Sequence, residues 1–556
     1  MPKPNVTIVG AGIAGLTAGL RLAERGYQVS FYERDWFVGG KFRAFEWIGR
    51  ETNRRAFHEH SYHMFLNWYH NFFQIADEIG ARKHFIPLKS VKFLRQGQFP
   101  QWKELVNFGS LATIPQNLFS GVLPIPDMFL YMYSVIDLLG TPMKQSKYRD
   151  LISVNAFAST KPYATEKSVS LYDEYLAKTF AIASYLTAAK SFQTFIEYNS
   201  YCPDPMYWAL DGDCFNRFLA PLLAKLQQLG AKFNMGHNVE GLILNRDGQV
   251  SGIRYRKFTP NYSRSLSEHH WDELKVASDS QQSEIEGPLI VAVPHAALCD
   301  LLSADMLNRS PHLGEIAKLQ SVPMASVHLH LKDKFASRLR SAGITLPREP
   351  VVLVDSDFKL SFVANSRLWP DSPEPYLNVV ASDSRPLNTL KAPEEFTYDR
   401  ESTKSGDRLS LHDPVTTLDH ILCELRKFVH FEEDEIDKEL LQIDRNVGRE
   451  LFINEIGSWK WRPETRTKIK NLFLAGDFCR NAIDVVCLEG AVVSGLEAAE
   501  CVRTYCGQGS PITIETPKRY PYSMFWPWKF MLAPYAAGAW AWSAYRDLAR
   551  RLDLTR

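Results

Sequence analysis

A glycine-rich string near the start of the chain, Gly10–Gly15 with the sequence GAGIAG, has the composition of a phosphate-binding turn. Between a strand and a helix, such a turn offers backbone N–H groups and the positive end of the helix dipole to a pyrophosphate. Gly10 permits the tight turn, Gly12 lets the pyrophosphate approach the backbone, and Gly15 lets the helix pack closely on the strand. The spacing therefore predicts a dinucleotide site.

An acidic residue follows about 20 residues further on, as this kind of site requires. Glu33, followed by Arg34, closes a second apolar strand, where its carboxylate can accept hydrogen bonds from both ribose hydroxyls of an adenosine. The same negative charge would repel a 2′-phosphate, which disfavours NADP. This unit alone leaves FAD and NAD open.

The elements that must position these residues form a βαβ unit. Apolar and β-branched residues predict strands over Asn5–Val9 and Gln28–Tyr32, and helical spacing predicts a helix over Leu16–Arg25 between them. Later in the chain, the same criteria predict helices over Phe215–Leu229 and Leu488–Val502, and strands over Lys232–Asn234, Gly241–Leu244, Val250–Tyr255, Pro288–Val293 and Asn471–Ala475. Long stretches of different character separate these segments, which indicates that the α/β domain is discontinuous.

Three further segments resemble motifs of the flavoprotein superfamily that contains the phytoene and ζ-carotene desaturases and the flavin amine oxidases. They are Val38–Lys41 (VGGK), Leu472–Asp477 (LFLAGD) and Leu488–Ala491 (LEGA). The resemblance implies FAD as the cofactor, with Asp477 at the ribityl chain. It also implies that the last helix points its N-terminus at the flavin N1/C2=O edge, where reduction places negative charge.

The resemblance to the plant and cyanobacterial carotene desaturases extends to Glu59–Asn71. This segment is similar to that family's E-T-G-L-H-x-F-F-G-A-Y-P-N, and it matches at Glu59, His63, Phe65, Tyr69 and Asn71. Leu210–Gly212 and Ile290–Pro294 also resemble family segments, and Val239 falls where backbone groups hold the adenine. Asn67, Trp68, His70 and the segment Phe478–Val486 depart from the family pattern. The match covers mainly the FAD domain, so it implies the cofactor and the fold more directly than the substrate.

Together, the glycine-rich unit and the resemblance predict one cofactor site. It is formed by Gly10, Gly12, Ile13, Ala14, Gly15, Glu33, Arg34, Gly39, Gly40, Lys41, His63, Val239, Gly476, Asp477, Leu488, Glu489 and Ala491. His63 is also the candidate catalytic residue, with three roles open: proton acceptor, polar handle for the substrate, or structural imidazole. No metal is predicted, because the H-x-H-x2-H spacing of His58, His60 and His63 is not a common zinc pattern.

The predicted fold class is α/β, with a Rossmann-type (GR2-like) FAD-binding domain that is discontinuous in sequence. We assign residues 1–84, 205–311 and 446–506 to this domain, and residues 85–204 and 312–445 to an inserted α+β substrate-binding domain. Residues 507–556 form an aromatic, amphipathic C-terminal tail.

The position before the last helix bears on the reaction class. Flavin amine oxidases usually carry an aromatic residue there as one wall of a cage for the amine, whereas this chain has Cys487. A small apolar wall favours a carotenoid, isoprenoid or other lipid, desaturated by hydride transfer to flavin N5. An amine oxidase, a flavin-dependent isomerase or saturase of a polyene, and a non-catalytic lipid or prenyl-protein escort stay open. The electron acceptor, oxygen or a quinone, is also open.

Charge and aromatic content indicate the partners. With 64 Lys+Arg against 63 Asp+Glu, the chain has no global field that would attract nucleic acid. Aromatic residues make up 12% of the chain, and many of them lie in Leu118–Leu139 and in the tail, where Trp526, Trp528, Trp540 and Trp542 precede several arginines. Trp and Tyr favour the headgroup layer of a bilayer, and Arg is attracted to anionic lipid. We therefore expect a membrane surface as partner; Leu118–Leu139 could instead be core, and the tail could instead dock on the protein or on another subunit.

Cysteine usage and the N-terminus indicate the compartment. The eight cysteines include no CxxC pair, which favours a reducing compartment. The chain passes from a short polar lead directly into a strand, with no secretory signal pattern, and no apolar stretch reaches the ~18 residues that a spanning helix needs. These features predict a peripheral protein on the cytoplasmic side of a membrane.

Overall fold

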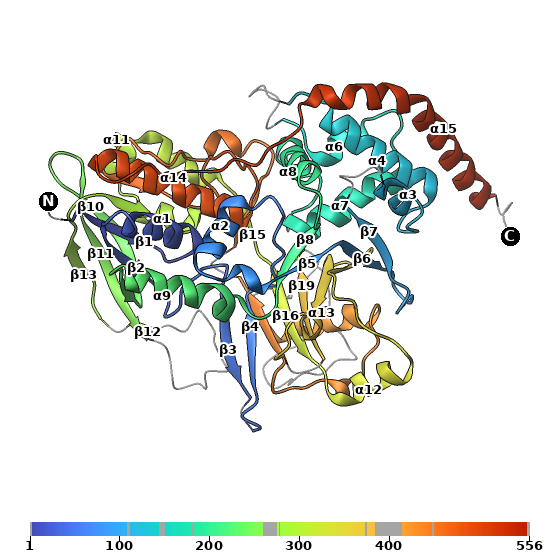
Figure 1. Ribbon diagram of the computed structural model, residues 1–556, viewed down its shortest axis with the longest axis horizontal. Coiled ribbons are helices and arrows are strands. Elements are labelled where there is room, and N and C mark those ends of the chain that lie inside the picture. The colour runs from blue at the N-terminus through green and yellow to red at the C-terminus, as the bar shows by residue number, and fades with distance from the viewer. Residues whose placement is uncertain are drawn as a thin grey trace.

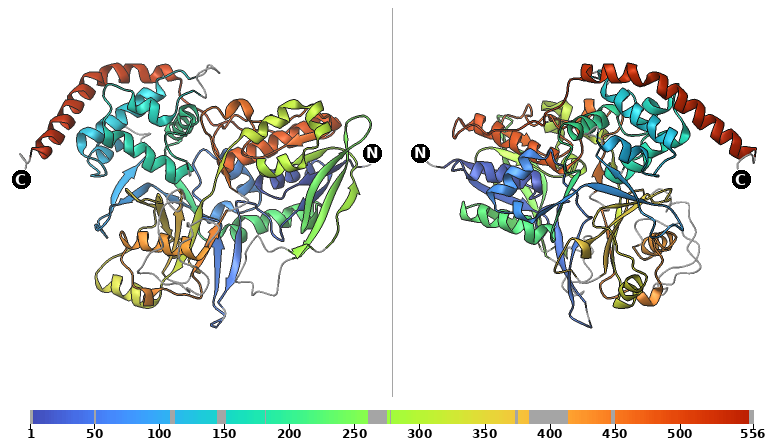
Figure 2. Two further views of the ribbon diagram at one scale, coloured as in Figure 1. Left: turned by 180° about the vertical axis from the view of Figure 1, so that it is seen from behind. Right: turned by 45° about the vertical axis from the view of Figure 1, so that its right-hand side comes forward.

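The structure, a computed structural model, describes residues 3–49, 51–107, 112–143, 151–180, 182–259, 275–276, 278–372, 375–383, 414–446 and 450–552. Figure 1 shows an elongated molecule with a sheet-and-helix unit beside the N-terminus and, next to it, a second sheet below a group of helices. The C-terminal helix runs along the outside of that group and projects beyond it, as both views of Figure 2 also show.

The first βαβ unit forms as the sequence predicts. Strand β1 (Asn5–Val9) pairs in parallel with β2 (Gln28–Glu33), and helix α1 (Ile13–Ala23) connects them. The helix begins three residues before the predicted start at Leu16, because Gly12 is its N-cap and Ile13 is already helical.

The first sheet is parallel and takes its strands from three distant parts of the chain. Its order is β22-β14-β1-β2-β9, where β9 is Lys232–Met235, β14 is Leu289–Val291 and β22 is Leu472–Leu474. Each of these strands overlaps a predicted one. The order reverses at β1, since β2 lies on one side of it and β14 on the other, and such a point opens a crevice for a ligand at the carboxyl ends of the strands.

Both faces of this sheet are covered. On one face, Val6 and Ile8 share a core with the leucines of α1 and with α14 (Leu488–Cys506). On the other face, Val9 and Leu289 pack with the antiparallel strands β10 (His237–Leu244) and β11 (Val250–Thr259). Around this unit lie α2 (His70–Glu78), α9 (Ala220–Gln228), α10 (His295–Leu301), α11 (Ala304–Arg309), β12 (Lys275–Val276) and β13 (Gln281–Glu284). The predicted helix Phe215–Leu229 begins as a π-helical turn over Phe215–Leu219 and continues as α9.

The second sheet has seven strands in the order β20-β16-β19-β18-β17-β6-β7. These strands are β6 (Ser90–Leu94), β7 (Lys103–Val106), β16 (Ala325–His330), β17 (Val351–Leu353), β18 (Leu360–Ala364), β19 (Tyr376–Ala381) and β20 (Gln442–Arg445). Helices α12 (Asp333–Ser341) and α13 (Pro414–Arg426) lie beside it, and the helices above it are α3 (Thr113–Leu118), α4 (Ile125–Leu139), α6 (Val154–Ser159), α7 (Glu166–Phe180) and α8 (Ala189–Tyr201). Three two-stranded sheets complete the fold: β3 (Ala44–Ile48) with β4 (Arg55–Glu59), β5 (Phe85–Leu88) with β8 (Tyr207–Leu210), and β15 (Ser321–Val322) with β21 (Leu451–Phe452).

A buried histidine cluster joins the β3–β4 hairpin to the second sheet. His58 stacks on His328 with ring centroids 4.4 Å apart, and its Nε2 lies 3.1 Å from Nε2 of His330. Burial lowers the pKa of all three imidazoles. Nearby, the buried Arg43 pairs with Asp444 at 3.1 Å. His58 is therefore a neutral packing residue between two units of the fold.

Most of the C-terminal tail forms one helix. Helix α15 runs from Trp526 to Arg551 with Pro534 inside it. Proline removes one backbone hydrogen bond from a helix, and packing of α15 against α4 maintains the helix on both sides of this position. No helix among the described residues is long and apolar enough to cross a membrane.

The segment Leu118–Leu139 belongs mostly to the core. In α4, Met128, Leu130, Tyr131 and Tyr133 are buried, and α15 covers part of this helix. Of the two interpretations of its aromatic content, the structure supports the core rather than a membrane-contacting surface for α4.

Close packing of α14 on α1 provides a test of the fold. A Cβ atom on Gly495 would lie 2.3 Å from the carbonyl oxygen of Ala14, so Gly495→Ala must push the two helices apart. We expect it to lower the free energy of unfolding by about 1–3 kcal/mol, the usual cost of overpacking. Gly314→Ala is the matched control, since its Cβ meets nothing nearer than 3.7 Å. Equal thermal stability of the two variants would contradict this packing.

Candidate functional site

A cavity of about 480 Å³ lies at the point where the strand order of the parallel sheet reverses. All of the predicted cofactor residues line it except Gly15 and Glu489. The structure therefore brings together residues that the sequence separates by more than 400 positions.

The glycine-rich turn has the geometry that its composition predicts. Gly10 has φ +97°, and a Cβ there would lie 2.5 Å from the carbonyl oxygen of Ala292. A Cβ on Gly15 would lie 2.2 Å from the carbonyl oxygen of Gly10, so this residue packs behind the turn and does not line the cavity. A Cβ on Gly12 would meet nothing nearer than 4.0 Å, because Gly12 faces the open cavity.

Glu33 is held in place at the end of β2. Its Oε2 accepts a hydrogen bond from the Ala11 N–H at 2.7 Å, and its Oε1 accepts one from the Asp35 N–H at 3.0 Å. Each carboxylate oxygen has more than one lone pair. The carboxylate therefore faces the cavity in a fixed orientation and can still accept hydrogen bonds from a ribose.

A second glycine turn lies on the first. Gly39 donates its N–H to the Ala11 carbonyl at 2.9 Å, and Gly39 and Gly40 have φ values of +101° and +62°. The Cα of Gly40 is the protein atom nearest to a Cβ placed on Gly12. Two turns without side chains thus form one smooth cradle, and Arg34 and Lys41 add positive charge at its edge. This cradle fits a dinucleotide pyrophosphate.

The loop before α14 delivers the other half of the site. Gly476 donates its N–H to the Ser494 hydroxyl at 2.8 Å, and Asp477 next to it lines the cavity. The buried Arg462 donates to the carbonyl oxygens of Asp477, Phe478 and Cys479 at 3.2, 3.0 and 2.7 Å, and it pairs with Asp484 at 3.0 Å. Arg462 is a positioning residue that the sequence reasoning missed, because no motif surrounds it.

The N-terminus of α14 opens onto the cavity. Leu488 and Ala491 line the cavity, and the N-cap Cys487 accepts the Gly490 N–H on Sγ at 3.4 Å. Position 487 is small, as expected, but the hydroxyl of Tyr69 lies beside its thiol and also lines the cavity. An aromatic wall is therefore present near this helix end, supplied by a different segment.

Glu489 has a different role from the predicted one. Its carboxylate is fully buried and accepts hydrogen bonds from the Asn71 N–H at 2.9 Å, the Asn71 side-chain amide at 2.7 Å and the Phe72 N–H at 2.9 Å. It thus binds the N-terminus of α2, where the first backbone N–H groups have no partner within the helix. Burial raises the pKa of Glu489 to about 7. This side chain fixes α2 on α14 and does not face the cofactor cavity.

His63 lines the cavity, and Glu59 orients its ring. Its Nδ1 lies 3.5 Å from Oε2 of Glu59, and its ring packs edge-on against Phe42. Glu59 is itself fixed, because its Oε1 accepts the Cys214 N–H at 2.7 Å. Since Nδ1 faces the carboxylate, Nε2 is the nitrogen left to meet a ligand.

Among the described residues, one group of three could offer ligand atoms to a metal: Glu59, His63 and Cys214, within 4.8 Å of one another. Burial raises the pKa of the Cys214 thiol well above its usual value, whereas a metal needs the thiolate. Glu59 already holds His63 and a backbone N–H. The chemistry of this set fits a hydrogen-bonded cluster rather than a metal site.

Much of the rest of the cavity is lined by a second unit, which consists of the seven-stranded sheet and the helices above it. Its wall includes Val91, Tyr175, Lys178, Pro350, Val352 and Val380, and Tyr207 of β8 lies beside Tyr175. The hydroxyl oxygens of Tyr175 and Tyr207 lie 3.1 Å apart. Sequence reasoning found none of these residues, because they come from several elements far apart in the chain and none belongs to a motif.

This fold and this cradle define a dinucleotide-binding protein of the flavoprotein type. The family of flavin-containing amine oxidoreductases matches residues 13–503, and the chain belongs to it. It is a flavin-containing oxidoreductase, and its relatives include carotene desaturases.

Individual relatives are distant over the full length. The zeta-carotene desaturase of Zea mays is 21% identical over 567 residues, which cover 92% of this chain and 85% of that protein. The zeta-carotene desaturase of Solanum lycopersicum is 36% identical, but over 86 residues that make up 15% of this chain and 14% of that protein. In structure, cyclohexylamine oxidase of Brevibacterium oxydans matches 91% of this chain and 100% of its own at 12% identity, with a TM-score of 0.55. That last likeness shows a common fold.

Gly12 tests the cradle independently of catalysis. We expect Gly12→Ala to fold normally, since its Cβ has room within the protein, but to bind flavin about tenfold or more weakly, in line with the ~1–3 kcal/mol cost of overpacking. The measurements are flavin absorbance per protein chain and the melting temperature of the apoprotein. Gly314→Ala, with similar room and no cavity contact, should keep its flavin. Full flavin content in Gly12→Ala would show that the cradle is elsewhere.

Glu489 gives a second test. In Glu489→Gln, one carboxylate oxygen becomes an NH₂ group, and a donor must face either the Phe72 N–H or the two donors of Asn71. We expect a loss of about 1–3 kcal/mol in the free energy of unfolding, the cost of a buried unsatisfied group. Because burial raises the pKa of Glu489 to about 7, above that of the unfolded chain, the folded protein takes up a proton here, and wild-type stability should rise as the pH falls from above 7 toward about 4.5, the unfolded-state value. Unchanged stability in a chemical denaturation experiment would refute this role.

Proposed function

We propose that this protein is an FAD-dependent oxidoreductase that desaturates a long hydrophobic substrate, a carotenoid or another isoprenoid lipid, by hydride transfer to flavin N5. One observation carries the proposal: a single cavity joins the dinucleotide cradle to a wall of apolar and tyrosine side chains from the second unit. The relatedness to zeta-carotene desaturases supports the substrate class. FAD rather than another flavin is supported by Glu33, which is placed to bind the ribose of an adenosine.

When bound, FAD supplies the two-electron acceptor, and the protein supplies position and a dry environment. Val486 and Cys487 offer a small apolar surface at the N-terminus of α14, against which a hydrocarbon chain can lie. Tyr62, Tyr69 and Tyr207 line the same space and exclude water from it. The N-terminus of α14 lines the cavity, so the positive end of its dipole would be available to stabilise the negative charge that a bound flavin gains on reduction.

Desaturation removes a hydride and a proton from neighbouring carbons while the double bond forms between them. We assign the proton to His63, whose Nε2 can accept it while Glu59 stabilises the resulting imidazolium through Nδ1. Oxygen or a membrane quinone would serve as the final electron acceptor. His63 thus acts as the general base, and Glu59 acts as its positioning residue.

The rival within the family is amine oxidation. Tyr69 beside Cys487 is the observation that favours it, because an aromatic side chain near the last helix could form one wall of an amine cage. A flavin-dependent isomerase or saturase of a polyene and a non-catalytic lipid escort are further rivals. An isomerase or saturase would convert the substrate without net flavin reduction. A lipid escort would bind the lipid without any turnover.

Anaerobic mixing separates these functions. We expect the flavin absorption to bleach when phytoene or ζ-carotene is added in detergent micelles, and to stay unchanged with putrescine or cyclohexylamine. Bleaching by the amines alone would establish amine oxidation. Conversion of the polyene without bleaching would indicate an isomerase, and binding without either change would indicate an escort.

The role of His63 is tested in the same experiment. We expect His63→Gln to retain FAD and to slow flavin reduction by about 10²–10⁴-fold, the usual contribution of a general base. His312→Gln is the matched control, because His312 has the same kind of contact, Nδ1 to Glu315 at 3.0 Å, away from the cavity. Equal rates of flavin reduction in the two variants would show that His63 is a structural or binding residue and not a general base.

A further inference from the structure

The C-terminal helix α15 is fixed on the protein by one face. Ala536 and Ser543 are seven residues apart, so they lie on one face of the helix, and both are buried. Ala536 packs into a cluster with Leu130 and Tyr133 of α4. These small residues let α15 lie close against the helix below it, along the outside of the helical group (Figure 2).

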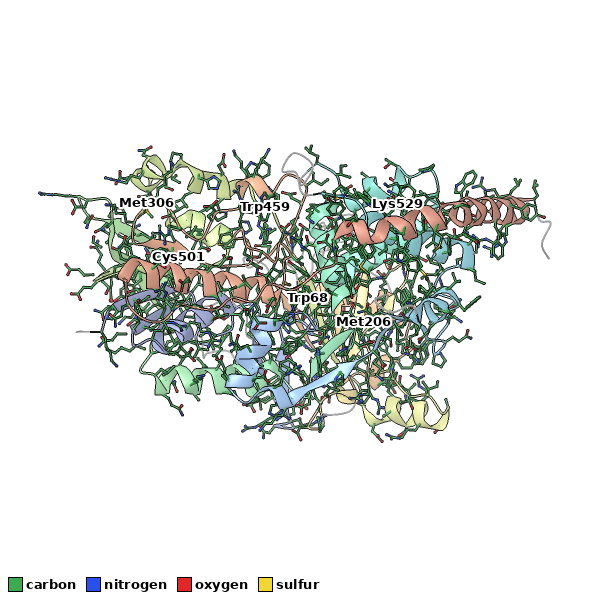
Figure 3. All side chains as sticks on the ribbon, turned by 45° about the horizontal axis from the view of Figure 1, so that its top comes forward. Trp68, Met206, Met306, Trp459, Cys501 and Lys529 are labelled. Atoms are coloured by element: carbon green, nitrogen blue, oxygen red, sulfur yellow. The ribbon has the colours of Figure 1, made fainter. Side chains whose placement is uncertain are left out.

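Two buried carboxylates of α4 set the rotation of α15. Asp127 accepts hydrogen bonds from the Ser543 hydroxyl at 2.8 Å and from Arg546 at 2.6 Å. Asp137 pairs with Lys529, which marks this helix in Figure 3. Because a buried acid without its partner is costly, these pairs hold α15 in one orientation along most of its length.

Much of the remaining surface of α15 and of its ends is exposed and rich in aromatic side chains. Residues 524–552 hold more than half of the exposed large hydrophobic side chains in the described part of the chain. They are Met524, Trp526, Trp528, Phe530, Met531, Tyr535, Trp540, Trp542, Tyr545, Leu548 and Leu552. An apolar patch of this size on a water-soluble surface marks an interaction site.

The charges on α15 are arranged in the same way. Its one acidic residue, Asp547, pairs with Lys167 of α7 at 2.8 Å. Lys529 pairs with Asp137 and Arg546 pairs with Asp127, both on α4. The other two basic residues of the helix, Arg550 and Arg551, are exposed. The exposed surface of α15 therefore includes both aromatic side chains and positive charge.

We propose that α15 docks this protein on the surface of a lipid bilayer that contains anionic headgroups. Trp and Tyr partition to the headgroup layer because one end of each side chain is apolar and the other is polar. With 26 residues, α15 is about 39 Å long at 1.5 Å per residue, yet it lacks the apolar stretch of a spanning helix, so it lies in the plane of the surface. A second copy of the chain could also bury the tryptophans, but a bilayer with anionic headgroups fits both the exposed Trp and Tyr and the exposed Arg550 and Arg551.

Docking would bring the cavity close to the bilayer, and this part of the inference rests on the proposed function. Helix α7 contacts α15 through Lys167 and lines the cavity through Tyr175 and Lys178. Lys167 and Tyr175 are eight residues apart on one helix, which is about 12 Å along its axis. A lipid leaving the docked leaflet would therefore reach the cavity over a short path.

Vesicle binding of the full chain tests the proposal. We expect the protein to sediment with vesicles of phosphatidylcholine and phosphatidylglycerol, and the double variant Trp542→Ser with Tyr545→Ser to bind at least tenfold more weakly. Tyr505→Ser with Val276→Ser is the matched control, since both residues are exposed but belong to α14 and β12. Equal binding by the two double variants would overturn the proposal.

Two further measurements separate lipid binding from self-association. Arg550→Gln with Arg551→Gln should lose about fivefold per arginine on the anionic vesicles and little on pure phosphatidylcholine. Light scattering without lipid gives the oligomeric state. A dimer that Trp542→Ser with Tyr545→Ser converts to a monomer, without any vesicle binding, would assign the patch to a second copy. Vesicle binding needs no substrate, so its failure would leave the proposed oxidoreductase function untouched.

Discussion

Close approach of backbone to backbone is the constraint on which the rest of this structure depends. Gly10 lies against the carbonyl of Ala292, Gly15 against Gly10, and Gly495 of α14 against Ala14 of α1. At each contact, a single methyl group would overlap a carbonyl oxygen. These contacts bring β1, α1, β14 and α14 to one point, and the cavity lies there because no side chains fill it.

Buried polar groups then fix what surrounds this point. Arg462 holds the loop that carries Asp477 and Cys487 by donating to three of its carbonyls, and Glu489 holds α2 on α14 by accepting three hydrogen bonds. Glu59 orients His63 through its contact with Nδ1. In each case the buried charge is fully engaged, so its partners have one favourable arrangement. The cofactor half of the cavity is therefore preorganised.

The predicted residues lie where expected when local geometry decides their position. The glycines, Glu33 and the strands beside them occupy the places that their spacing implies, because a tight turn or an N-terminal helix dipole acts over a few residues. Glu489 did not, although it follows the cavity-lining Leu488. Its side chain turns toward α2, whose unpaired N–H groups only the folded chain brings within reach. Helix α15 likewise depends on tertiary packing, since α4 supports it around Pro534.

The sequence by itself determined the dinucleotide cradle, the discontinuous parallel sheet and the aromatic character of the C-terminus, because each depends on residue types at fixed short spacing. Only the tertiary structure decided which side chains complete the site and which face of α15 is exposed. Tyr175 and Val352 meet the cavity from separate elements, and Asp127 sets the rotation of a helix more than 400 residues later. Such contacts depend on how elements pack, and packing joins residues whose distance along the chain carries no signal.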